Sequence, residues 1–138
     1  MTTKNRVLIV AAHPDDEVLG CGGTVARHTD AGDTVHVLIM AEGTTSRDGA
    51  GHEDVDELRK AARQAADILG AQPPDFAEFP DNRMDTVALL DVTQRIEQVI
   101  AKTKPSIIYT HHGGDLNIDH RIVHQAVVTD HLGAQDHR

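Results

Sequence analysis

Two short stretches of this chain combine histidine and aspartate at a spacing that suits a metal ion. The first, AHPDDE, places His13 and Asp16 three residues apart, and the second, NIDH, ends at His120. Together these residues offer two imidazole nitrogens and one carboxylate oxygen, the three-ligand set of catalytic zinc, which leaves one position open for water. Asp15 lies next to a ligand without being one, so it is placed to accept a proton from that water.

The residue types alone leave other interpretations open. Two histidines and one aspartate also bind iron, manganese or cobalt. Paired aspartates and histidines build two-metal sites as well, so a metal-dependent phosphoesterase is an alternative in which a second ion is expected. A third interpretation needs no metal, because Pro14 suits the first turn of a helix and the acids after it favour the positive helix N-terminus. The second cluster, with Asp119 and His120, argues against this helix-start interpretation.

Both clusters follow short apolar runs that are typical of strands buried on two faces. The run VLIVAA at 7–12 precedes the first cluster, and SIIYT at 106–110 precedes the second. Continuous β-branched runs of this length suit a parallel sheet. In an open parallel sheet, ligands bind beyond the carboxyl ends of the strands where the winding reverses. We therefore expect the two clusters to face each other across one crevice.

The remaining elements follow from apolar periodicity and from turn residues. Helices are expected over 17–31, 53–69, 87–102 and 120–132, and further strands over 34–40 and 76–79. The order β-α-β-α-β-α-β-α predicts an α/β fold, a Rossmann-like, open and mainly parallel sheet flanked by helices. The length of 138 residues predicts one domain spanning 1–138.

The spacing of small and apolar residues predicts which sides of the helices face the sheet. The glycines of GCGG at 20–23 are expected to allow close packing of the first helix, with Cys21 as a small buried residue. They lack the G-x-G-x-x-G spacing of a nucleotide loop. His124, one turn after His120, is more often a solvated or core histidine than a ligand. The positions expected to face the core are Val18, Leu19, Val25, Ala61, Ala65, Leu69, Leu90, Ile96, Val99 and Ile100.

Composition excludes several classes of protein. The formal net charge is -9 and no Lys/Arg-rich run occurs, so nucleic acid and anionic membrane surfaces are disfavoured as partners. No apolar run approaches the roughly 20 residues that span a bilayer, so membrane insertion is not expected. The single cysteine, Cys21, excludes an internal disulfide and fits a reducing compartment. We expect a cytoplasmic protein.

These motifs resemble the LmbE-like, PIG-L family of zinc-dependent de-N-acetylases. The resemblance rests on AAHPDDEVLGCGGT and THHGGDLNIDHRIVHQAV and extends through AEGTTSRDG, AADILG and FPDNRMD. It implies a Rossmann-like fold and hydrolysis of the N-acetyl group of an N-acetylglucosamine-type amino sugar or its conjugate. The implied cofactor is Zn²⁺ and the implied partner is a small-molecule amino sugar. A homo-oligomer is left open.

The resemblance also implies roles for single residues. His13, Asp16 and His120 match the zinc ligands, Asp15 matches the general base, and Asp119 matches an orienting carboxylate. The family mechanism has zinc polarise the water and the amide carbonyl, while the base takes a proton from the water. Two residues lie in loops that contact the sugar in family members. These two are Arg47 and Asp85.

One position departs from the family pattern. Many members have a histidine three residues before the last ligand, where it stabilises the oxyanion or protonates the leaving amine; this chain has Asn117. An amide donates a hydrogen bond but does not carry a proton at neutral pH. The acid role then falls to Asp15, His111, His112 or His124, and the hypothesis is that Asp15 serves as both base and acid.

A second departure concerns length. Family chains generally continue past the last ligand, whereas this chain ends at QDHR. The C-terminal part of the family domain is therefore expected to be missing and the sheet to be incomplete. This keeps a different class of function open, that of a truncated and catalytically idle metal-binding domain.

Overall fold

Strands and helices alternate along the chain in the order that the apolar periodicity predicts. The computed structural model describes residues 4–42 and 52–135. The elements are β1 (Arg6–Ala11), α1 (Asp16–Asp30), β2 (Thr34–Ala41), α2 (His52–Leu69), β3 (Asp75–Phe79), η1 (Met84–Thr86), α3 (Leu89–Thr103), β4 (Ile107–Tyr109) and α4 (Ile118–Gln135). The predicted elements are confirmed to within a few residues, and the 3-10 turn η1 is an addition.

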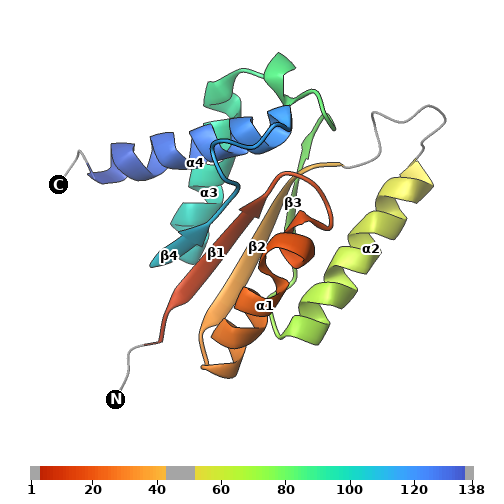
Figure 1. Cartoon of the computed structure of the whole chain (residues 1–138), viewed down its shortest axis with the longest axis vertical. Helices are drawn as coiled ribbons and strands as arrows, with labels where there is room; N and C mark the ends of the chain where they lie inside the picture. Colours follow the sequence, from red (N-terminus) through yellow and green to blue (C-terminus); the bar gives the residue numbers. More distant parts are fainter. Residues whose placement is uncertain (1–3, 43–51, 136–138) are drawn as a thin grey trace.

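The four strands form one open parallel sheet in the order β3-β2-β1-β4. The chain steps outward from β1 to β2 and β3 and then returns to the other side of β1 for β4. The winding therefore reverses between β1 and β4, the two strands that precede the histidine and aspartate clusters. Helices α1 and α2 cover one face of the sheet, and α3 and α4 cover the other (Figure 1). The predicted α/β fold is confirmed.

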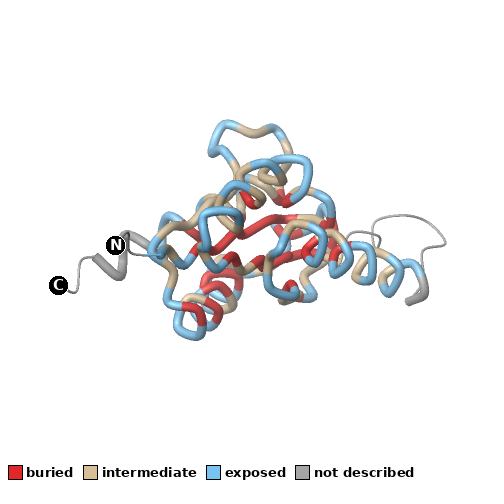
Figure 2. The backbone as a smooth tube through the Cα atoms, turned by 90° about the horizontal axis from the view of Figure 1, so that it is seen from below, coloured by how far each residue is buried: buried red, intermediate tan, exposed pale blue. Residues whose placement is uncertain are grey.

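The central strand β1 is buried on both sides, which explains its continuous apolar run. Leu8 and Val10 belong to the core beneath α3 and α4, while Val7 and Ile9 belong to the core beneath α1 and α2. Alternate residues of a strand point to opposite faces, so each core receives every second side chain. Figure 2 shows the buried positions gathered along the strands between exposed outer helix surfaces. Among the described residues, no helix is long and apolar enough to cross a membrane.

The predicted core face of α2 is wrong at Ala61, and that of α3 is confirmed at Ile96 and Val99 but wrong at Leu90. In α2 the buried residues are Ala62 and Ala66, whereas Ala61 is exposed. Alanine-rich helices mark their apolar stripe weakly, because alanine occurs on both faces. In α3 the residue Leu90 is 64% exposed, since the buried stripe runs through Val92, Ile96 and Val99 at a helical spacing.

The face of α1 that packs on the sheet also differs from the prediction. Its buried stripe runs through Glu17, partly buried Cys21 and Val25, at intervals of four residues. Leu19 lies off this stripe and is 83% exposed. The glycines do not serve close packing, because a Cβ atom at Gly20 or Gly23 would meet nothing within 4 Å.

Candidate metal centre

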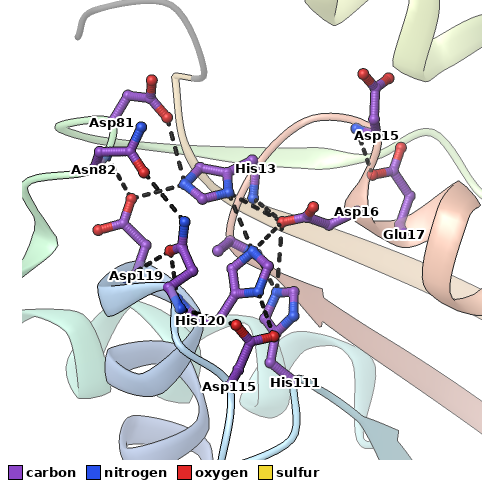
Figure 3. A network of polar contacts seen from close by, with 12 residues as sticks. His13, Asp15, Asp16, Glu17, Asp81, Asn82, His111, Asp115, Asp119 and His120 are labelled. Carbon is purple, nitrogen blue, oxygen red and sulfur yellow. Dashed lines mark hydrogen bonds and ion pairs between the residues drawn. The ribbon is translucent and has the colours of Figure 1, made fainter.

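Three side chains from two strand ends converge beyond the carboxyl ends of β1 and β4 (Figure 3). His13 Nδ1 lies 3.1 Å from Asp16 Oδ2, and His120 Nε2 lies 3.0 Å from the same oxygen. The two nitrogens are 3.3 Å apart. Ligand atoms of a tetrahedral zinc ion, with bonds of about 2.0–2.1 Å, stand about 3.4 Å from one another. The donor set and its spacing therefore fit one divalent metal ion.

Local structure holds the first two ligands in a fixed relation. Strand β1 ends just before His13, and α1 begins at Asp16, so both lie on one tight turn. The Asp16 carboxylate accepts the backbone N–H of His13 at 2.9 Å, while Asp16 N donates to the His13 carbonyl at 3.1 Å. These reciprocal bonds fix the carboxylate beside the imidazole without help from other elements.

The far side of the His13 ring rests on a buried carboxylate. His13 Nε2 lies 2.7 Å from Asp119 Oδ2, and Asp119 is 0% exposed. Asp119 also accepts the backbone N–H groups of Asn82 at 2.6 Å and Met84 at 2.9 Å. Asp81, which the sequence analysis missed, adds a second carboxylate 3.4 Å from His13 Nε2. A carboxylate on the outer nitrogen of a metal-binding histidine sets its tautomer and orientation.

Hydrogen bonds and charges around His13 set the charge of the centre. Burial lowers the pKa of His13, but hydrogen bonds to Asp119 and Asp16 and their charges outweigh it and raise the pKa to about 10. Burial raises the pKa of Asp16 and of Asp119, yet hydrogen bonds, led by those to His13, hold both below the usual range. The centre thus attracts positive charge, a proton or a metal ion.

The second histidine ligand is held from behind and from one side. His120 Nδ1 lies 2.9 Å from Asp115 Oδ2, which leaves Nε2 for the metal. The ring of His111 stacks on His120 with centroids 3.8 Å apart and planes 13° apart. Stacked rings direct their lone pairs in parallel planes, so His111 and His120 do not share one ion. This geometry argues against a second metal held by His111, Asp115 and His120.

Two of the three histidines considered as general acids, His111 and His124, have hydrogen-bond partners, whereas the third, His112, is exposed. His111 Nε2 accepts the backbone N–H of Ala12 at 2.8 Å, and burial, followed by the charge of His120, lowers its pKa to about 4. A neutral His111 cannot donate a proton from that nitrogen. His124 Nδ1 donates to the His111 carbonyl at 2.8 Å, so it anchors the loop before α4.

Asn117, predicted as a catalytic residue, begins α4 as its N-cap. Its Oδ1 accepts the backbone N–H of Asp119 at 2.9 Å and that of His120 at 3.3 Å. These bonds satisfy free donors of the first helical turn and thereby place His120. The Asn117 side-chain amide donates to Asn82 Oδ1 at 3.3 Å, so both ends of the side chain have partners.

Three predicted site residues lie apart from the triad. The Asp15 side chain is exposed and points away from the three ligands in Figure 3. Asp85 is exposed in η1, and Arg47 lies outside the described residues. A cavity of about 220 Å³ adjoins the centre between β1, α1 and residues 110–112, with Asp16 and His111 in its wall.

Two residues of the centre, Asp81 and Asp115, were not predicted from the sequence, although the position of one of them could have indicated it. Asp81 follows β3 directly after Phe79 and Pro80, so the strand-end rule that found the two clusters applies to it as well. Asp115 lies within a loop, five residues before His120, where neither strand ends nor helical spacing indicate contact.

The fold and the centre define an α/β protein with a candidate metal site at the switch point of a parallel sheet. A protein-family model, PIG-L, described as GlcNAc-PI de-N-acetylase, matches residues 8–130. The chain belongs to this family, so the resemblance seen in the motifs is confirmed.

Similar proteins include deacetylases and one hydratase. The chain is 32% identical to "Uncharacterized deacetylase YaiS" of Escherichia coli (strain K12), over 87% of this chain and 64% of the relative. It is 32% identical to the diacetylchitobiose deacetylase of Thermococcus kodakarensis, over 75% of this chain and 39% of that protein. One similar solved structure is GalB, the 4-carboxy-2-hydroxymuconate hydratase of Pseudomonas putida KT2440. It matches with a TM-score of 0.80 and 28% identity, over 93% of this chain and 56% of that protein. The chain thus spans less than two thirds of each of these proteins.

Proposed function

We propose that this chain is a zinc-dependent hydrolase that removes the N-acetyl group from an N-acetylglucosamine-type amino sugar or its conjugate. The observation that carries this proposal is the convergence of His13 Nδ1, Asp16 Oδ2 and His120 Nε2 within 3.3 Å of one another. Membership of the PIG-L family and similarity to a diacetylchitobiose deacetylase support the same reaction.

The metal and its ligands have separate tasks in this proposal. A zinc ion held by the three ligands supplies Lewis-acid polarisation of the amide carbonyl and acidification of water. Asp119 keeps His13 in the tautomer whose Nδ1 is free, and Asp115 does the same for His120 Nε2. Asp16 contributes the carboxylate that links the two histidines.

We assign to Asp15 the transfer of the water proton to the leaving amine. Hydrolysis forms a C–O bond from water and breaks the C–N bond, so the water proton must reach the leaving amine. Asn117 cannot carry a proton, and His111 Nε2 accepts the backbone N–H of Ala12, which leaves Asp15, His112 and Nε2 of His124 as candidates. We assign both steps to Asp15, which adjoins the ligand Asp16: it acts first as base and then as acid, with its exposed carboxylate turning toward the triad. Replacing Asp15 with alanine should abolish turnover, and near-normal turnover would contradict the assignment.

The first experiment measures metal content. Elemental analysis after gel filtration should find about one zinc per chain, and Asp16→Ala should lose it; the elution volume also reports any homo-oligomer. Release of free amine from N-acetylglucosamine and diacetylchitobiose then tests the reaction. One zinc without amine release would support a catalytically idle metal-binding domain. Two metals per chain would favour a phosphoesterase, and no metal in a folded chain would refute the proposal.

A hydratase is the second candidate, because the P. putida relative named as a hydratase shares the fold at 28% identity. Addition of water to a conjugated double bond also needs an activated water and a base. An assay that follows the loss of ultraviolet absorbance of an unsaturated hydroxy-tricarboxylate separates the two reactions. Loss of absorbance without amine release would replace the deacetylase proposal with this one.

A further inference from the structure

Asp15 adopts a backbone conformation that residues other than glycine rarely adopt. Its φ is 93° and its ψ is -29°, in the left-handed region that favours glycine. Such a residue persists only where its surroundings hold it, and such residues cluster at functional sites. The Asp15 carbonyl accepts the N–H groups of Val18 at 3.1 Å and Leu19 at 2.9 Å, so this strained residue begins α1. Its side chain makes no capping bond, which leaves the carboxylate free.

Glu17 contacts the strained residue from inside the protein. Its carboxylate accepts the Asp15 backbone N–H at 3.1 Å, and Figure 3 shows the two residues joined by this bond. Glu17 is only 6% exposed and continues the buried stripe of α1 toward Cys21 and Val25. An acid that only favoured the helix N-terminus would satisfy that role while exposed to water.

Burying the Glu17 carboxylate costs free energy that its hydrogen bonds must offset. Among the described residues, no lysine, arginine or histidine forms an ion pair with Glu17. The hydrogen bond that its carboxylate accepts comes from a backbone N–H group, that of Asp15. Removing a carboxylate from water without a cation costs free energy that only such bonds can offset.

We propose that Glu17 is a positioning residue: its buried carboxylate holds the Asp15 backbone in the left-handed conformation and so fixes where the Asp15 side chain leaves the chain. Without this acceptor, Asp15 relaxes toward negative φ, and the direction in which its side chain leaves the backbone changes relative to the metal centre. The consequence for catalysis rests on the proposed function, whereas the backbone contact itself does not. Glu17 serves as a hydrogen-bond acceptor and not as a proton carrier.

Two replacements separate these roles. Glu17→Gln keeps an acceptor oxygen of the same reach, and Glu17→Met keeps length and suits an apolar site while removing the acceptor. Asp91→Ala, at an exposed first-turn acid of α3, is the matched control for general effects on a helix N-terminus. Each variant is prepared as the full chain, loaded with zinc and compared for metal content.

The first readout is hydrogen exchange of the Asp15 amide, measured by NMR. We expect exchange at least about tenfold faster in Glu17→Met, and within about threefold of the parent chain in Glu17→Gln and Asp91→Ala. Unchanged exchange in Glu17→Met would overturn the proposal. This readout is independent of activity, so it decides the matter even if the chain releases no amine.

The second readout is turnover of the amino-sugar substrate. In Glu17→Met we expect kcat to fall about tenfold or more, with KM and zinc content unchanged, and Glu17→Gln to restore most of kcat. A Glu17→Gln variant as slow as Glu17→Met would show that the charge or the proton of Glu17 is required, against the proposal. Loss of zinc in Glu17→Met would place the effect on Asp16 instead. Absence of activity in the parent chain refutes the proposed function alone.

Discussion

Asp119 offers the sharpest test of how the centre is built, because its carboxylate contacts both the loop at 82–84 and the proposed metal ligand His13. It is fully buried and joins three donors, His13 Nε2 and the N–H groups of Asn82 and Met84. In Asp119→Asn, the less costly orientation of the amide keeps oxygen toward His13 and Asn82 and turns NH₂ toward the Met84 N–H. That buried N–H then lacks an acceptor, which costs about 1–3 kcal/mol of unfolding free energy.

The same replacement weakens the hold on His13, so zinc affinity should fall about 10–100-fold. Urea unfolding with a chelator measures the first effect, and competition against a metal indicator measures the second. Asp115→Asn is the matched control, since its side chain is 36% exposed and contacts the other histidine ligand. It should lose metal affinity with little loss of stability, because contacts of exposed charges contribute little to the free energy of unfolding. An Asp119→Asn chain with unchanged stability and unchanged affinity would refute this account of the centre.

Two further predictions concern the loop before α4 and the end of α1. A Cβ atom at Gly113 would lie 2.8 Å from His124 Nε2, so Gly113→Ala should lower the free energy of unfolding in urea by about 1–3 kcal/mol. Gly23→Ala, in an open helical position, should raise it by about 0.5–1 kcal/mol. Equal effects of the two replacements would contradict this prediction. The hydrogen bond from His28 holds the pKa of Asp33 below its usual range. This stabilisation is present at neutral pH and is lost as pH falls through the lowered pKa, so the penalty of Asp33→Ala should shrink below about pH 4. A penalty independent of pH would contradict it.

The sheet was predictable from the sequence because its strands are buried on both faces. A short, continuous and β-branched apolar run is typical of such a strand, and the turn residues between the runs set the order of elements. Helix faces were less predictable, because they depend on a phase that alanine marks poorly. Ala61 and Ala62 are adjacent alanines that the sequence does not distinguish, and only packing against the sheet determines that Ala62 is the buried one.

The site was predictable where it followed strand ends and unpredictable where it depended on loop shape. The convergence of His13, Asp16 and His120 could be predicted because two strands of a parallel sheet end at one edge. The contact of Asp115 with His120 needs the specific course of the loop, which no periodicity encodes. For the same reason, the inward turn of Glu17 could not be told from an ordinary acid at a helix N-terminus.

The concentration of acids at the switch point follows from the arrangement around one imidazole. Carboxylate oxygens of Asp16, Asp81 and Asp119 all lie within 3.4 Å of His13 ring nitrogens. One protonated histidine cannot balance three carboxylates in a partly buried site, where their mutual repulsion is screened less than in water. A divalent ion bound on the Nδ1 side would add two positive charges and would leave the Nε2 bond to Asp119 intact. The acids that follow β1, β3 and β4 therefore have the arrangement expected of a cation site, and a fold that needed only a helix start would not gather them around one imidazole.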